Sequence, residues 1–157
     1  MMKRKKRPVA GEVIAIPLRD GSFGFGRILK DGANAFYDCK APEILPISQI
    51  ISQPVLFRLW VFDDLIQDGT WPIIGRAPLS EDLSNTLPSF IWAFFHPHPF
   101  IVTADSPEMI PATPEECQGL ERVAVWTPEE VSARLYDSLT GNGEKWIEKI
   151  EPSPDLA

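Results

Sequence analysis

The sequence predicts an α+β fold: a mostly antiparallel β-sheet, for which a partly closed barrel is one possible form, followed by one or two C-terminal helices. Three observations predict it. Short β-rich segments separated by tight turns fill most of the chain, the strongest amphipathic helix signal comes after them, and strands and helices do not alternate as they do in a parallel α/β fold.

The first expected element is a β-hairpin. Residues 12–18 and 23–29 are rich in β-branched and aromatic residues, and the pair Asp20-Gly21 between them is typical of a hairpin turn. A third short strand is expected over residues 35–39, after a second Asp-Gly turn. These segments predict an antiparallel sheet at the start of the fold.

The middle of the chain predicts a buried strand followed by shorter elements. Residues 55–62 form an apolar run that is expected to lie centrally in the sheet. One helical turn is expected over residues 65–68, ending at Gly69, and an edge strand over residues 71–75. Residues 76–89 predict a loop with a helical turn at residues 80–83.

The last third predicts three strands and then helix. Strands are expected over residues 90–95, 100–103 and 120–126, the last with Leu120, Val123 and Val125 buried. Thr127 and Glu130 have the spacing of a capping box, which predicts a helix that ends at Gly141. A second, shorter helix is expected from about residue 142 to 150.

Length and charge predict the domain organisation. We expect a disordered basic tail at residues 1–8, a single domain at residues 9–150 and a frayed C-terminus at residues 151–157. The formal net charge is −7, but five of the 15 Lys and Arg residues lie within residues 3–7, which leaves 10 cations against 22 acids elsewhere. The expected domain is therefore strongly acidic.

The acidic body predicts the kind of partner. A surface of this sign attracts basic proteins and repels nucleic-acid phosphates; the other interpretation is that the acidic residues only keep the protein soluble. The alternative is a regulatory or nucleic-acid-associated module that uses the basic N-terminal tail.

The location of the protein is predicted from its apolar runs and cysteines. The longest apolar run is interrupted by Arg58, so no membrane span is expected. The two cysteines lie outside any CxxC pair, which predicts reduced thiols in the cytoplasm.

Catalytic, metal and cofactor motifs are weak. His96 and His98 lie in a proline-bounded HxH segment without a third ligand, so neither a metal site nor the alternative of a small hydrolase is favoured. The chain has no GxSxG or HExxH motif. The glycines of residues 21–26 alternate with strand residues, which favours close packing or a bulge over a dinucleotide site. We therefore expect no enzyme activity and no cofactor.

Three residues are candidates for partner binding. Asp63 and Asp64 follow the buried strand where it emerges from the sheet, a position that holds side chains rigidly and exposes them. Trp71 stands in a polar neighbourhood, where it could be a surface anchor or a residue at the rim of the core. The other four tryptophans lie in apolar patterns and are expected in the core.

Several segments, taken in order, resemble the immunity protein 26 family of bacterial polymorphic toxin systems. They are EVIAIPL at 12–18 with Asp20-Gly21, FGFGRIL at 23–29, FYD at 36–38, PVLFRLWVFDD at 54–64, GTWPIIG at 69–75 and GLERVAVW at 119–126. The resemblance extends over about residues 9–150. It rests on the order of the segments, since each alone is an ordinary strand or turn.

The resemblance implies a mostly β domain that binds and neutralises a cognate toxin inside the producing cell. It names no toxin and carries over no catalytic residue. A basic toxin such as a nuclease would complement the acidic body, and occlusion of the toxin is the expected mechanism.

Overall fold

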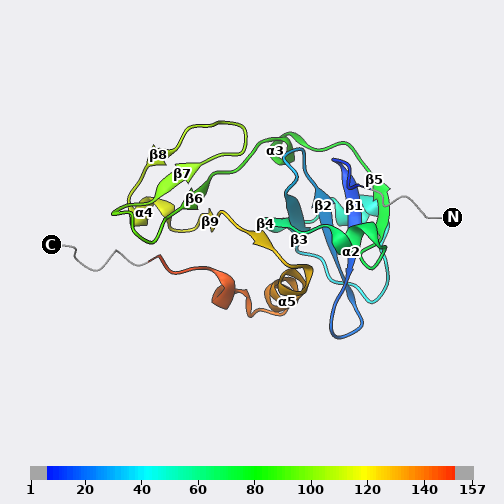
Figure 1. Ribbon diagram of the computed structural model, residues 1–157. Coiled ribbons are helices and arrows are strands. Elements are labelled where there is room, and N and C mark those ends of the chain that lie inside the picture. Colours follow the sequence, from blue (N-terminus) through cyan, green and yellow to red (C-terminus); the bar gives the residue numbers. More distant parts are fainter. Residues whose placement is uncertain (1–6, 151–157) are drawn as a thin grey trace. The chain divides into compact units, whose positions relative to one another are not determined.

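The computed structural model describes residues 7–150 (Figure 1). The chain divides into two compact units: unit 1 comprises Met1–Ser84 and Val125–Glu144, and unit 2 comprises Asn85–Ala124 and Lys145–Ala157. The expected single domain at residues 9–150 thus contains two compact parts. Most of the expected basic tail and the whole expected C-terminal frayed segment lie outside the described residues.

The fold is α+β, as predicted, with two mostly antiparallel sheets and few helices. Unit 1 holds a six-stranded sheet in the order β10-β4-β3-β2-β1-β5. The pairs are antiparallel except β10 with β4, and the sheet is open, with β10 and β5 at its edges. Its strands are β1 (Glu12–Pro17), β2 (Phe23–Ile28), β3 (Asn34–Tyr37), β4 (Val55–Val61), β5 (Ile73–Arg76) and β10 (Val125–Trp126).

The expected hairpin is confirmed as β1 paired with β2, in a register that places Val13 opposite Arg27 and Pro17 opposite Phe23. Gly21 makes the turn with a φ of +84°, a left-handed conformation that glycine adopts without strain. The strand expected at residues 55–62 is confirmed as β4, between β3 and β10, although only Phe57 and Leu59 in it are buried. The edge strand expected at residues 71–75 is β5, at residues 73–76.

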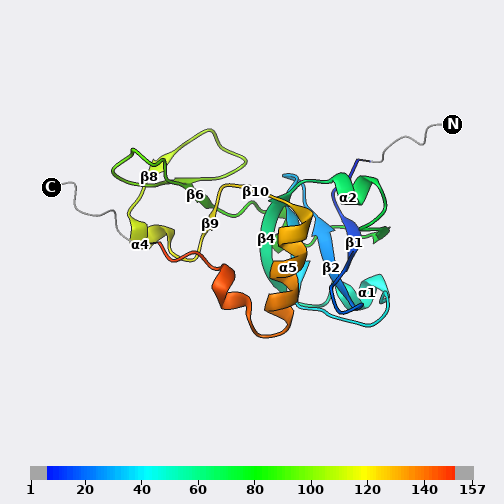
Figure 2. The ribbon, with the colours of Figure 1, turned by 60° about the horizontal axis from the view of Figure 1, so that its bottom comes forward.

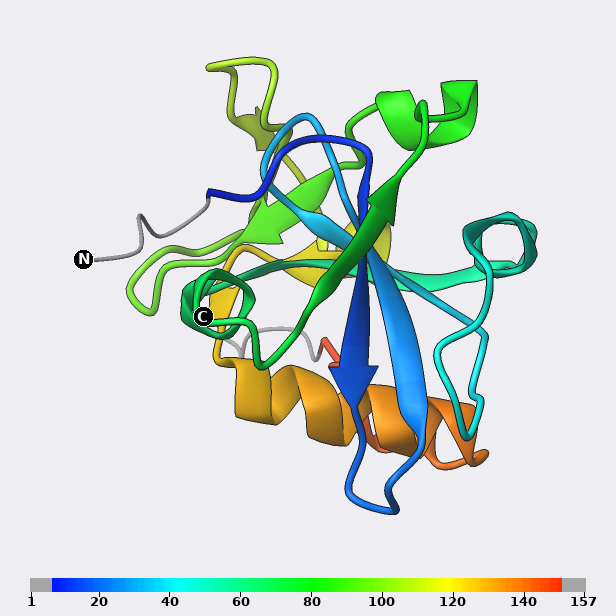
Figure 3. The same ribbon diagram turned by 90° about the vertical axis from the view of Figure 1, so that its right-hand side faces the viewer.

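Both faces of the sheet in unit 1 are covered. Helix α5 (Pro128–Leu139) lies along one face (Figures 2 and 3), where Val131 and Leu135 pack with Ile14 and Ile16 of β1. Alternate residues of β1 point to the other face, into a cluster that includes Ile50 of α1 (Ile47–Ile50). Unit 1 also contains α2 (Asp64–Gln67) and α3 (Glu81–Ser84).

The capping box of α5 is confirmed. The hydroxyl oxygen of Thr127 accepts a hydrogen bond of 3.2 Å from the Glu130 amide, and the Glu130 carboxylate accepts one of 3.2 Å from the Thr127 amide. These reciprocal bonds satisfy two amides at the start of the helix that have no partner within it. The spacing of Thr127 and Glu130 in the sequence therefore correctly predicts that the helix begins at Pro128.

Unit 2 is built on a smaller sheet, in the order β8-β7-β6-β9. The strands are β6 (Ser89–Ile91), β7 (Phe100–Val102), β8 (Ile110–Pro111) and β9 (Glu121–Arg122), accompanied by α4 (Pro114–Cys117). The core is small: Phe90, Ala112 and Cys117 are buried, and Trp92 and Leu120 pack against them.

Three element predictions were wrong. The expected strand 120–126 is split, because β9 pairs with β6 in unit 2 whereas β10 pairs with β4 in unit 1, and Val123 and Val125 are exposed. The expected strand 90–95 ends at Ile91, since the chain turns at Phe94 and Phe95. The expected helix 142–150 is only a 3-10 turn, η1 (Gly143–Trp146), in which Trp146 is half-buried.

None of the helices within residues 7–150 has the length and apolar character needed to cross a membrane.

Candidate functional site

The structure brings the three nominated residues together at one corner of unit 1, where β4 leads into α2 and the chain returns to β5. Asp63 precedes α2, Asp64 is its first residue, and Trp71 lies just after it. The helical turn ends before Gly69, whose φ of +86° reverses the chain, and the Trp71 amide donates a hydrogen bond of 2.9 Å to the Leu65 carbonyl. We refer to residues 62–72 as the α2 corner.

The two aspartates differ in their surroundings. Asp64 is exposed, whereas Asp63 is half-buried. Their backbone carbonyls accept hydrogen bonds from Gln67 and Asp68, at 2.9 and 3.0 Å, so both residues are held by the helical turn. A carboxylate at the start of a helical turn is favoured by the amide dipoles, which is the structural reason for Asp64.

Trp71 is not an exposed anchor. Its side chain is only 2% exposed and belongs to the core of unit 1 with Ile66 and Val131. It lines a hollow of about 350 Å³ together with Leu65 of α2 and Glu129 of α5. The position is closer to the rim-of-core alternative, because the ring is buried yet borders a surface hollow.

A second hollow, of about 420 Å³, lies on the Asp63 side of the α2 corner. Asp63, Ile66 and Val125 contribute to its lining, and so does Asn34 at the start of β3. Asn34 is buried, and its side-chain oxygen has no hydrogen-bond partner among the described residues. A buried acceptor without a donor is uncommon in folded proteins, so this atom marks the hollow as unusual.

The lining of this second hollow is mixed in character. Phe62 and Val125 are exposed apolar residues, and Arg7 and Lys30 add positive charge to a lining that also contains Asp63. Sequence reasoning missed Asn34, because an asparagine at the start of a strand carries no signal of its surroundings.

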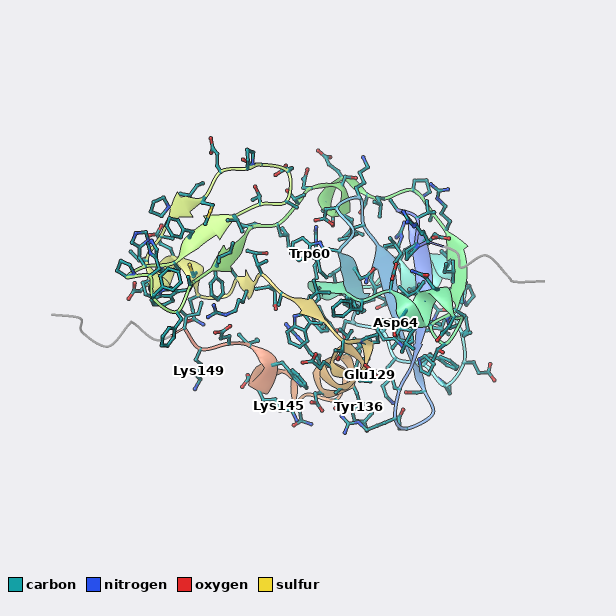
Figure 4. All side chains as sticks on the ribbon, viewed as in Figure 1. Trp60, Asp64, Glu129, Tyr136, Lys145 and Lys149 are labelled. Atoms are coloured by element: carbon teal, nitrogen blue, oxygen red, sulfur yellow. The ribbon has the colours of Figure 1, made fainter. Side chains whose placement is uncertain are left out.

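Negative charge gathers around the α2 corner and the start of α5. Five carboxylates lie on these two elements and their ends: Asp63, Asp64, Asp68, Glu129 and Glu130. Asp64 and Glu129 are labelled in Figure 4, and Leu65 beside Asp64 shares a hollow with Glu129. Across residues 7–150 the chain has 20 Asp and Glu against 11 Lys and Arg.

Arg19, which lines the same hollow as Glu129, is engaged with residues further along α5. Arg19 forms an ion pair with Asp137 at 3.2 Å, and its guanidinium stacks 4.2 Å from the centre of the Tyr136 ring. Tyr136 is labelled on α5 in Figure 4. Glu129 and Glu130 are exposed, and the ion pair of Arg19 is with Asp137 and not with either of them.

The histidines of unit 2 interact with their own loop. The rings of His96 and His98 are 4.6 Å apart, edge to face, and each Nδ1 lies 3.0 Å from a backbone carbonyl, that of His98 and of Pro99 respectively. In the described part of the chain, no group of three or more His, Cys, Asp or Glu side chains is placed to hold a metal ion. These contacts hold both rings against their own loop.

The cysteines lack the surroundings of a nucleophile. Burial, and secondarily Asp38, raises the pKa of the Cys39 thiol; burial, and secondarily Glu116, raises that of Cys117. Both thiols therefore stay protonated at neutral pH, and a protonated thiol is a poor nucleophile.

Comparison with known proteins identifies the family of this chain. The sequence model of the family described as Immunity protein 26 matches residues 9–98, which include the α2 corner; the resembling segment at 119–126 lies beyond the match. No curated protein and no solved structure matches the chain. Since the match spans more than half of the sequence, the chain belongs to the immunity protein 26 family.

Proposed function

We propose that this protein neutralises a cognate polymorphic toxin by binding to it in the cytoplasm of the producing cell. The family match over residues 9–98 carries the proposal. The protein acts through its surface and performs no catalysis of its own. The protonated thiols and the histidines held by backbone carbonyls support this part.

The α2 corner is the proposed contact surface in unit 1. Asp63 and Asp64 lie at the start of its helical turn, so their backbone is already ordered before a partner binds. Glu129, at the start of α5, lines the first hollow together with Trp71 and adds a carboxylate beside the α2 corner. A basic toxin, such as a nuclease, suits this surface, because opposite charges speed the encounter and fix its orientation.

The mechanism we propose is occlusion. A stable interface buries about 1,600 Å² in total, roughly 800 Å² on each partner. An interface of this size centred on the α2 corner would also cover the second hollow, where a donor group of the toxin could satisfy the buried oxygen of Asn34. The toxin's own active surface would then be inaccessible to its substrate.

Co-expression with the toxins encoded beside this gene tests the function. Cells that carry the wild-type protein should survive induction of one of these toxins, and the purified pair should bind. If every neighbouring toxin kills as fast with the protein as without it, the proposed function is wrong.

Paired substitutions test the surface. Asp63→Asn with Asp64→Asn removes two charges with little change in shape, and should lower the association rate by about tenfold at low salt and flatten its salt dependence. Asp38→Asn, at another exposed position in unit 1, is the matched control. Equal association rates for the double variant and the control would exclude the α2 corner as the contact.

A further inference from the structure

Two neighbouring phenylalanines of unit 2 lie almost entirely in solvent. Phe94 is 104% exposed and Phe95 is 85% exposed, in the connection between β6 and β7. Folded domains usually bury such side chains, since transfer of a phenylalanine ring out of water is among the larger favourable contributions to folding. Adjacent exposed rings are therefore a candidate interaction surface.

The backbone that carries the rings is a tight turn. The His96 amide donates a hydrogen bond of 2.9 Å to the Ala93 carbonyl, so Phe94 and Phe95 occupy the two central positions of a β-turn. The indole Nε1 of Trp92 donates a second bond, of 2.9 Å, to the His96 carbonyl. The side chains at the centre of such a turn point away from the body of the unit.

The base of the turn is braced by aromatic contacts. The rings of His96 and His98 each lie 4.8 Å from the ring of Phe100, the first residue of β7. The prolines on either side of His98 restrict the backbone further. Phe94 and Phe95 are thus presented by a preorganised loop, which reduces the entropy lost when they bind.

The surroundings of the turn determine which partner it suits. Residues 85–104 contain no Asp, Glu, Lys or Arg, although 24% of the chain is charged. The segment therefore has no cation to attract an anionic membrane surface. The excess of 20 acids over 11 cations in residues 7–150 disfavours the approach of a second copy of the chain.

We infer that the turn inserts Phe94 and Phe95 into an apolar pocket on the toxin, as a second contact in addition to the α2 corner. This inference rests on the proposed function, and both rings lie inside the matched residues 9–98. Charge at the α2 corner governs how fast the partners meet, whereas buried aromatic anchors govern how slowly they part.

The test uses the full chain and the purified toxin domain encoded by the neighbouring gene. Phe94→Ser with Phe95→Ser should weaken the affinity by about 100-fold, mainly through faster dissociation. Leu87→Ser is the matched control, because Leu87 is also an exposed apolar residue of unit 2, at 51%. Its affinity should stay within about threefold of the wild type, and all variants should keep the wild-type unfolding midpoint.

The outcomes separate this inference from the proposed function. If the wild type binds no neighbouring toxin, both fall. If the wild type and the double variant bind the toxin equally well, the inference alone is wrong. It is also overturned if the double variant instead loses binding to vesicles of phosphatidylcholine and phosphatidylserine, or loses a dimer seen by light scattering, while toxin affinity is unchanged.

Discussion

The guanidinium of Arg27 lies inside unit 1 and donates a hydrogen bond of 3.0 Å to the hydroxyl of Tyr37. Arg27 is only 2% exposed. Its other bonds go to backbone carbonyls, those of Gly11 at 2.9 Å, Ala77 at 2.7 Å and Pro78 at 2.9 Å. One arginine of β2 therefore ties the residues before β1 to the residues after β5, at the edge of the sheet.

Arg27→Lys should destabilise the protein by about 2 to 4 kcal/mol. A lysine ammonium cannot reproduce the planar fork that reaches these acceptors, and buried carbonyls would be left unsatisfied. The measurement is the free energy of unfolding in urea, compared with Arg76→Lys, which changes an exposed arginine of β5. Equal stability of the two variants would mean that the hydrogen bonds of Arg27 contribute little.

Gly24→Ala should destabilise unit 1 by about 1 to 3 kcal/mol, because a Cβ atom at Gly24 would lie 2.6 Å from Cδ2 of Leu135 in α5. Leu135→Ala alone creates a cavity and should cost about 2 to 5 kcal/mol. In the double variant, Gly24→Ala should no longer destabilise the protein, because Leu135→Ala removes the side-chain atom that the new Cβ would meet. If the losses of stability in the two single variants simply add up in the double variant, contact with Leu135 does not explain why residue 24 is a glycine.

Local signals predicted most of unit 1. The Asp-Gly turn fixed the β1–β2 hairpin, Thr127 and Glu130 fixed the start of α5, and the strand glycines indeed mark close packing, at Gly24 against Leu135. In each case the residues that carry the signal are close together in sequence. Such local structures can be predicted without knowing the rest of the fold.

Long-range pairing could not be predicted in the same way. The apolar pattern of residues 120–126 is that of one strand, but its two ends pair with different sheets and leave Val123 exposed. Trp71 has polar neighbours in sequence, yet the chain reversal at Gly69 places its ring in the core. The side-chain oxygen of Asn34, which has no hydrogen-bond partner within residues 7–150, reflects three-dimensional surroundings that the sequence around it does not show.

Thr127→Ala should lower the free energy of unfolding by about 1 kcal/mol, through loss of the capping hydrogen bond to the Glu130 amide. Thr70→Ala, at an exposed threonine outside a helix start, is the control and should change stability by less than about 0.5 kcal/mol. Glu130→Gln should have a smaller effect than Thr127→Ala, because glutamine also accepts from the Thr127 amide. An equal loss for the two threonine variants would count against the cap.

The surroundings of Asp20 in the hairpin turn make the stability of the folded protein depend on pH. Its pKa lies well below the ordinary value of 3.8, first because of Lys40, whose ammonium lies 2.7 Å away, and then because of the hydroxyl and amide of Ser22. A lowered pKa in the folded state means that the stabilisation is present above about pH 4 and is lost as the pH falls below it. The carboxylate is solvated, so we expect this effect to be small.

Titration of the Asp20 carboxyl by NMR checks the cause. Lys40→Met should raise the pKa of Asp20 towards 3.8, whereas Lys30→Met, which removes an exposed lysine that does not pair with Asp20, should leave that pKa low. An unchanged pKa in Lys40→Met would assign the shift to Ser22 instead.

Cys117 should be almost unreactive in the folded protein. It is buried in unit 2, and burial raises the pKa of its thiol above the ordinary value of 9.0, so both access and the thiolate fraction are reduced at pH 7.5. In a Cys39→Ser background, the labelling of Cys117 by a thiol reagent should be at least about 100-fold slower than in denaturant, because reaction requires local opening of the unit.

The complementary Cys117→Ser variant reports on Cys39, which is half-buried and should label faster than Cys117. Rapid labelling of Cys117 in the native protein would show that the small core around Phe90 opens readily, and that unit 2 is less stable than its packing indicates.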